Sequence, residues 1–162
     1  MKYLPTLLLT TATGLLLTGS TACSKKDDPA ATDTSVGTAS YKLDGSTISG
    51  QSRAYTTNMI AGSQVTNILY INISDTPQLQ SNTQTVLLTF QKQPGQPNTA
   101  YQLYTIAYSK DGTLQPINYA NNVTTLKETS SGVFSGTFSG TSTSPTGHTI
   151  SEGVFTDAHL TK

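Results

Sequence analysis

Short apolar stretches that alternate with polar residues recur along most of this 162-residue chain, and they constrain its fold more than any other feature. The clearest is Val65–Ile73, in which Leu69, Ile71 and Ile73 fall on one face at a spacing of two residues. Such alternation is typical of a β-strand with one buried face. Outside the N-terminal segment, no stretch of a dozen residues shows the 3.6-residue period of an amphipathic helix. The pattern therefore predicts an all-β domain.

Turn residues separate the apolar stretches at intervals of roughly ten residues, a spacing typical of antiparallel sandwiches and barrels. Asp44-Gly45 and Lys110-Asp111-Gly112 are the clearest turns. The pattern predicts a single antiparallel domain over residues 40–162, either a β-sandwich or a lipocalin-like β-barrel. Its expected strands are Tyr41–Leu43, Ser52–Ile60, Val65–Ile73, Thr85–Phe90, Ala100–Tyr108, Thr113–Tyr119, Val123–Glu128, Val133–Gly140, and His148–Ile150 with Val154–Leu160.

The first 22 residues differ in composition from the rest of the chain. Lys2 supplies one positive charge, and Leu4–Leu17 is an uncharged run with two leucine clusters. A membrane-spanning helix needs about 20 consecutive apolar residues, whereas a signal peptide has a shorter run that ends in small residues. Residues 1–22 are therefore predicted to be an export signal that is removed, so that Cys23 becomes the first residue.

Cys23 is the only cysteine, so it has no partner for an intramolecular disulfide. It directly follows the small residues Ser20, Thr21 and Ala22. This arrangement resembles the lipobox of bacterial lipoproteins, with Ser20 where that motif usually has Leu. The resemblance implies that Cys23 carries acyl chains such as palmitate and anchors the protein in the outer membrane. The alternatives are a thiol that behaves as a small hydrophobe and ordinary secretory cleavage after Ala22.

Two polar segments follow Cys23. Lys26, Asp27 and Asp28 resemble the surface-export signal of Bacteroidota lipoproteins, which implies display on the outside of the cell. The alternative is a solvated charged patch at the start of a tether. Residues 29–39 have no periodicity and little apolar bulk, so 23–39 are predicted to form the lipidated start of a flexible tether.

Three motifs of the domain resemble small β-rich lipoproteins of Bacteroidota. They are YKLDG at 41–45, GVFSGTFSG at 132–140 and ISEGVFTD at 150–157. In those families the closing strands form a hairpin with its Phe side chains turned inwards, which implies the same for Phe134, Phe138 and Phe155. The resemblance carries no activity and no functional residue other than the lipid-bearing Cys23.

Composition and motifs exclude several function classes. The formal net charge is zero and 11% of residues are charged, so the chain lacks the basic stripe that nucleic-acid binding requires. It contains no Gly-x-Ser-x-Gly elbow, phosphate-binding glycine loop or calcium loop, and no cofactor or catalytic motif is identified. The sequence therefore favours a non-catalytic binding or envelope-associated module, with a glycan, small molecule or protein as ligand.

One alternative is a metal-dependent or hydrolytic enzyme. His148 and His159, with Glu152 and Asp157 between them, are residue types that can bind a metal ion or transfer protons. Their spacing matches no established ligand pattern, and such side chains on a polar hairpin are more often simply solvated.

A further alternative is a carbohydrate or small-molecule binder that uses the barrel interior or a tyrosine cluster. Tyr101, Tyr104, Tyr108 and Tyr119 fall within one expected hairpin. Exposed tyrosines on a sheet can stack against sugar rings or partner proteins. They also pack well within sheets with the hydroxyl group at the rim, and that is the more common role of Tyr in strands.

Overall fold

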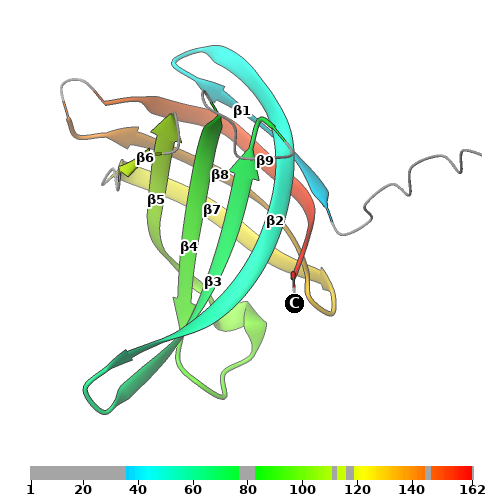
Figure 1. Cartoon of the computed structure of the whole chain (residues 1–162), viewed down its shortest axis with the longest axis vertical. Helices are drawn as coiled ribbons and strands as arrows, with labels where there is room; N and C mark the ends of the chain where they lie inside the picture. Colours follow the sequence, from blue (N-terminus) through cyan, green and yellow to red (C-terminus); the bar gives the residue numbers. More distant parts are fainter. Residues whose placement is uncertain (1–35, 77–82, 111–112, 116–118, 145–146, 162) are drawn as a thin grey trace, which may run out of the picture. The chain divides into compact units, whose positions relative to one another are not determined.

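The computed structural model of the protein describes residues 36–76, 83–110, 113–115, 119–144 and 147–161. The predicted all-β class is confirmed, because this part of the chain consists of strands and one short 3-10 turn, η1 (Asn98–Ala100) (Figure 1). Its strands are β1 (Gly37–Leu43), β2 (Ser46–Ala61), β3 (Gln64–Ser74), β4 (Gln84–Lys92), β5 (Gln102–Lys110), β6 (Thr113–Gln115), β7 (Tyr119–Ser130), β8 (Val133–Ser142) and β9 (Thr149–His159).

The predicted signal peptide, Cys23, the export motif at 26–28 and the tether as far as residue 35 lie outside the described residues. β1 begins at Gly37, three residues before the predicted start of the domain. Glycine is required there, because a Cβ atom would lie 2.1 Å from the carbonyl oxygen of Thr156 on β9. Within the described ranges, no helix has the length and apolarity that crossing a membrane would need.

The strands form one sheet in the order β6-β5-β4-β3-β2-β1-β9-β8-β7, and every ladder between them is antiparallel. All ladders but one join strands that follow each other in the sequence, and the exception joins β1 to β9. The sheet is therefore a meander whose first and last strands pair, which is the connectivity of an up-and-down barrel. Figure 1 shows it curling around one inner face.

β6 and β7 occupy the place of one interrupted strand. Each antiparallel ladder reverses the strand direction. Five ladders separate β1 from β6 and three separate β1 from β7, so both strands run opposite to β1 and therefore in the same direction as each other. β6 pairs with β5, and β7 pairs with β8. β6 covers only the start of the strand predicted over Thr113–Tyr119, and β7 contains the strand predicted over Val123–Glu128 but begins earlier, at Tyr119. Pro116 lies between them, and proline has no N–H group to donate to a ladder.

Polar contacts join the two margins of the curled sheet near η1. The Asn98 side chain donates a 2.9 Å hydrogen bond to Glu128 of β7, and Lys92 donates one of 2.8 Å to Asn98. The other Glu128 oxygen accepts the N–H of Gly132 at 2.9 Å. The hydrogen bonds from Gly132 and Asn98 hold the pKa of Glu128 below its usual value. A carboxylate thus ties β7 and its turn to η1.

The inner face of the sheet holds the core. Its members alternate along β3 and β4, as the two-residue period predicts, whereas the bulges of β9 change the spacing between Ile150, Phe155 and Ala158. The largest fully buried side chains are Tyr41, Phe90, Phe134, Phe138, Phe155, Leu69, Ile71, Ile73, Leu88, Ile106, Ile150 and Val86. Together these side chains form an apolar core on the inner face.

β8 and β9 are held together by reciprocal pairs of glycine and phenylalanine. Gly136 lies opposite Phe155, and Phe138 lies opposite Gly153. A Cβ atom at Gly136 would lie 2.8 Å from the Phe155 ring, and one at Gly153 would lie 2.7 Å from the Phe138 ring. Each ring thus covers the glycine of the facing strand. The inward orientation expected for these phenylalanines is confirmed, since Phe138 and Phe155 are buried.

β9 is one bent strand, whereas the sequence left open a strand or a pair. Glu152 and Asp157 have backbone φ angles of 51° and 53°, in the left-handed region that non-glycine residues rarely adopt. The β8–β9 register shifts beside each of them, between Phe138 and Gly140 and between Phe134 and Gly136. Both acidic residues are therefore bulge residues that bend the strand.

β2 extends beyond the body of the sheet. Its first part pairs with β1 as far as Ser52, which lies opposite Gly37. Its last part pairs only with β3, as far as Ala61 opposite Gln64. β3 pairs with β4 only from Asn67 onwards. Residues 56–66, here called the hairpin arm, therefore project from the sheet as a two-stranded ribbon (Figure 1).

Candidate functional site

The structure does not bring together the four residues of the predicted enzyme or metal site. His148 immediately precedes β9 and His159 ends it. An 11-residue strand is about 35 Å long, so the two imidazoles lie at opposite ends of the sheet. Among the described residues, no three His, Cys, Asp or Glu side chains lie close enough to share a metal ion. A single site formed by His148, Glu152, Asp157 and His159 is therefore wrong.

These side chains have other roles. Glu152 forms a 2.7 Å ion pair with Lys42 of β1, and both groups are largely exposed. The backbone N–H of Asp157 donates to the hydroxyl group of Ser135 at 3.0 Å. His159 lies opposite Val133 in the β8–β9 ladder. Glu152 thus joins β9 to β1 through its side chain, and Asp157 joins β9 to β8 through its backbone.

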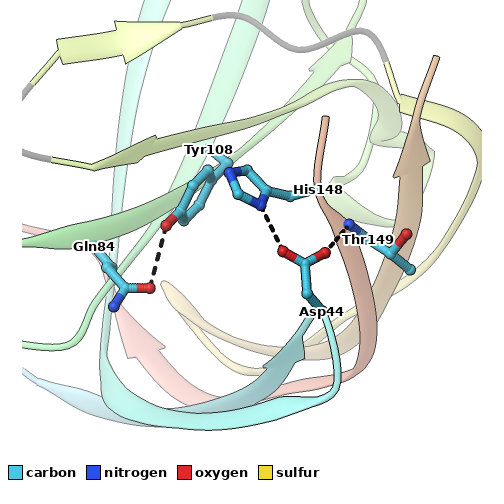
Figure 2. A network of polar contacts seen from close by, with 5 residues as sticks. All are labelled: Asp44, Gln84, Tyr108, His148 and Thr149. Atoms are coloured by element: carbon cyan, nitrogen blue, oxygen red, sulfur yellow. Dashed lines mark hydrogen bonds and ion pairs between the residues drawn. The ribbon is translucent and has the colours of Figure 1, made fainter. Parts of the chain in front are cut away.

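His148 contacts a carboxylate that the sequence did not single out. Its Nδ1 atom lies 2.6 Å from Asp44, whose other oxygen accepts the N–H of Thr149 at 2.8 Å (Figure 2). The Asp44 N–H donates back to the Thr149 carbonyl group at 2.9 Å. The hydrogen bond from Thr149, followed by that of His148, lowers the pKa of Asp44. This cluster joins the β1–β2 turn to the start of β9, which is a structural role.

Tyr108 packs against the same cluster from the inner face. Its ring meets the His148 ring edge-on at a centroid distance of 4.9 Å. Its hydroxyl group donates to the Gln84 side chain at 3.2 Å (Figure 2). The described members of the predicted tyrosine cluster therefore differ in environment, because Tyr108 is a core residue.

Of the other described tyrosines, Tyr101 packs against the core that contains Tyr108, whereas Tyr104 points away from it. Tyr104 is 63% exposed, and it is the extra residue of a β4–β5 bulge, since Thr105 and Leu103 pair with consecutive residues of β4. Tyr101 precedes β5, is half-buried and carries the Lys92 ammonium group 4.9 Å above its ring. The Tyr119 side chain lies outside the described residues. Strict alternation along Ala100–Tyr108 would place Tyr104 and Tyr108 on one face of the sheet. The bulge at Tyr104 puts them on different faces.

A different set of side chains forms a groove on the outer face of β2 and β3. Ser52 and Ala54 are fully buried, so their alternating neighbours Gln51, Arg53 and Tyr55 point outwards. The groove has a volume of about 390 Å³. Its lining consists of Gln51, Arg53, Tyr55, Asn72, Ser74, Thr76 and Thr161. We call this the β2–β3 groove.

Cross-strand register and the chain end build the groove. Gln51 lies opposite Ser74, and Arg53 lies opposite Asn72. β1 covers β2 only as far as Ser52. Beyond this point Leu160 and Thr161 lie beside β2, and the Thr161 N–H donates to the Ala54 carbonyl group at 2.8 Å. The chain end thereby forms one wall, and neighbouring strands form the floor.

Tyr55 is the aromatic wall of the groove. It stacks on Tyr70, its partner in the ladder, with ring centroids 4.7 Å apart and an interplanar angle of 22°. Burial, and after it the neighbouring Tyr70, raises the pKa of Tyr55, so the phenol stays protonated and can donate a hydrogen bond at neutral pH. The stacked pair fixes the ring beside Arg53.

The groove combines three kinds of recognition group. An aromatic face supports the apolar face of a ring. Amide and hydroxyl groups exchange hydrogen bonds with hydroxyl-rich ligands. A guanidinium group matches a carboxylate with two parallel hydrogen bonds. The period of two in Ser52–Ile60 could have placed Arg53 and Tyr55 together, but their facing residues depend on the register set by the Gly62-Ser63 turn.

Comparison of the chain with protein families, with curated proteins and with solved structures finds no match.

Proposed function

We propose that the protein is an outer-membrane lipoprotein, anchored through Cys23 and displayed on the cell surface, whose β domain is a non-catalytic binding module. The lipobox-like residues before Cys23 and the Lys26-Asp27-Asp28 motif support the anchor and its outward orientation. The observation that carries the binding role is the β2–β3 groove, with Arg53 beside the stacked Tyr55.

The ligand proposed for the groove is an acidic carbohydrate, such as a chain containing uronic acid. A sugar ring would stack on Tyr55 while its carboxylate binds Arg53. Asn72 and Ser74 would exchange hydrogen bonds with its hydroxyl groups. The inner face is a weaker candidate for the same role, because the described side chains there are mostly apolar and offer few hydrogen-bonding groups to a hydroxyl-rich ligand.

Binding is tested with an array of acidic and neutral glycans, followed by calorimetry on each hit. Arg53→Gln should weaken binding of acidic glycans at least tenfold and affect neutral ones less. Tyr55→Ala should weaken both. The matched controls are Lys127→Gln, which removes an exposed positive charge, and Tyr104→Ala, which removes an exposed tyrosine; neither should change affinity. Absence of glycan binding, or equal loss in the controls, would overturn the assignment.

The anchor is tested separately. Cys23→Ala should abolish incorporation of a labelled fatty acid, and Lys26→Ala with Asp27→Ala and Asp28→Ala should retain the label but protect the protein from protease added to intact cells. Labelling that persists without Cys23 would refute lipid attachment at this residue. Full protease protection of the unmodified protein would refute surface display.

A further inference from the structure

The tip of the hairpin arm exposes apolar side chains on both of its faces. Ile60 is 71% exposed and Val65 37%, and these two residues lie opposite each other in the β2–β3 ladder. Met59, 47% exposed, precedes Ile60 and therefore points to the other face. A protein groove would cover one face of a hairpin. A tip with apolar side chains on both faces instead suits a medium that surrounds it.

The arm is also free of charge. No Asp, Glu, Lys, Arg or His occurs between Arg53 and Asp75. Moving a charged side chain out of water is costly, whereas an uncharged tip avoids this penalty. The arm therefore carries no charged side chain that would oppose contact with a nonpolar medium.

The arm leaves the sheet at the end where the chain enters from its N-terminal segment. β1 begins at Gly37 opposite Ser52, and β2 continues past this point towards its turn. From Ser52 to Ile60 the strand advances about 27 Å. Residues 23–36 can span at most about 50 Å. A lipid anchor at Cys23 therefore leaves the tip within reach of the same membrane.

We propose that the tip of the hairpin arm, Met59–Val65, inserts into the interfacial region of the membrane to which the protein is anchored. The inference rests on the anchor of the proposed function. The Gly62-Ser63 turn lies furthest along the arm, so it would enter first. Insertion would therefore stay shallow, within the interfacial region where water still reaches the unpaired N–H and C=O groups of the turn, and Met59, Ile60 and Val65 would lie at the boundary between headgroups and acyl chains.

Insertion gives the β2–β3 groove a fixed orientation. The anchor and the arm provide two separate attachments, and the groove lies on the same two strands as the arm, closer to the body of the sheet. The groove would thus be held beside the membrane surface with its opening towards solvent.

The test uses the full chain with Ile60→Cys, purified from membranes of the expressing cells, labelled with an environment-sensitive fluorophore and reconstituted into vesicles of phosphatidylethanolamine and phosphatidylglycerol. The probe at position 60 should shift its emission to shorter wavelengths and be quenched by spin-labelled lipids. The control is Val123→Cys on β7, a residue 63% exposed and apolar but outside the arm, whose probe should not respond.

Unchanged emission on vesicles would overturn the proposal. A shift already present without lipid would overturn it too, since the tip would then be covered by a second copy or another part of the chain. Failure of the anchor is read separately from the number of labelled thiols, because lipidated Cys23 is blocked and an unmodified one reacts. In that case Cys23→Ser with Ile60→Cys is mixed with the same vesicles and judged by the same two criteria.

Discussion

The β8–β9 and β2–β3 hairpins are built from the same alternation of apolar and polar residues, yet they have opposite roles. In β8–β9, glycines and rings on facing strands interlock, and both strands have a further neighbour in the sheet. In β2–β3, pairing with β1 and β4 ends before the turn, so the arm has two open edges and exposed apolar side chains. Neighbouring strands, rather than strand character itself, decide whether such residues become core or free surface.

This difference separates scaffold from working surface. The β8–β9 hairpin supplies Phe134, Phe138 and Phe155 to the core. The β2–β3 hairpin supplies the groove near its base and the apolar tip at its end. Substitutions of the buried β8–β9 residues should therefore change stability, whereas substitutions in the groove and at the tip of the arm should change binding with little effect on stability.

The largest effect is expected from Phe155→Ala. Phe155 is fully buried and covers Gly136, so truncation leaves a cavity that the sheet cannot close. The free energy of unfolding should fall by about 3–5 kcal/mol, measured by urea denaturation. Val154→Ala, at the exposed neighbouring position, is the control and should cost less than about 1 kcal/mol. Similar losses in both variants would show that the two rings are not the centre of the core.

Gly153→Ala should have the next largest effect. The added methyl group would lie 2.5 Å from the Phe138 carbonyl oxygen and 2.7 Å from its ring, which forces the strand or the ring to move. Overpacking of this kind costs about 1–3 kcal/mol. Combining it with Phe138→Leu should give a smaller total loss than the sum of the two single variants. Simple additivity in urea denaturation would mean that ring and glycine do not interact.

Asp44→Asn should have a smaller effect that depends on pH. The pKa of Asp44 is lower in the folded protein, so its carboxylate contributes stability above its unfolded pKa of about 3.9, and this contribution is lost as the pH falls through the folded value. Asp44 and His148 are exposed, so the effect should not exceed about 1 kcal/mol near neutral pH.

The measurement is the unfolding free energy of both proteins from pH 7 down to pH 2. The two curves should converge at the acidic end. Asp157→Asn, which removes one carboxylate elsewhere and keeps a side chain suited to positive φ, controls for net charge. A constant difference between the curves would show that ionisation of Asp44 does not stabilise the fold.

The smallest effect on stability is expected from Ile60→Ser combined with Val65→Ser. Both side chains are exposed beyond the last pairing with β1 and β4, so unfolding in the absence of lipid should change by less than about 0.5 kcal/mol. With the probe moved to Met59→Cys, the same variant should lose the fluorescence response on vesicles. A stability loss comparable to that of Gly153→Ala would place the arm in a core contact and remove the contrast between the hairpins.

The alternation of Leu69, Ile71 and Ile73 was sufficient to predict the all-β class, because a two-residue period is a local property. Tyr104 and the β6–β7 interruption were not predictable in the same way. A bulge adds one residue and reverses every later side chain, and its position depends on the partner strand. Register also determines the two glycine–phenylalanine pairs of β8 and β9, Gly136–Phe155 and Gly153–Phe138.

The candidate site could be predicted from the sequence to a lesser extent than the fold. Arg53, Tyr55 and Asn72 come from two strands, and the wall at Thr161 comes from the chain end, so no short motif contains the groove. His148 and Asp44 lie next to the neighbouring strands β9 and β1 but are 104 residues apart in the sequence, so no local pattern predicts their contact. Proximity in the sequence instead suggested a shared site for His148 and His159, but the 11 residues of β9 place them at opposite ends of that strand.

Amide hydrogen exchange of the anchored protein, with and without vesicles, tests the contrast between the two hairpins most directly. Amides of β8 and β9 should exchange only through global unfolding in both conditions. Amides of residues 57–65 should exchange rapidly without lipid and become protected on vesicles. An arm already as protected as β8 and β9 without lipid, or one that exchanges equally fast on vesicles, would contradict the division into interlocked scaffold and membrane-facing arm.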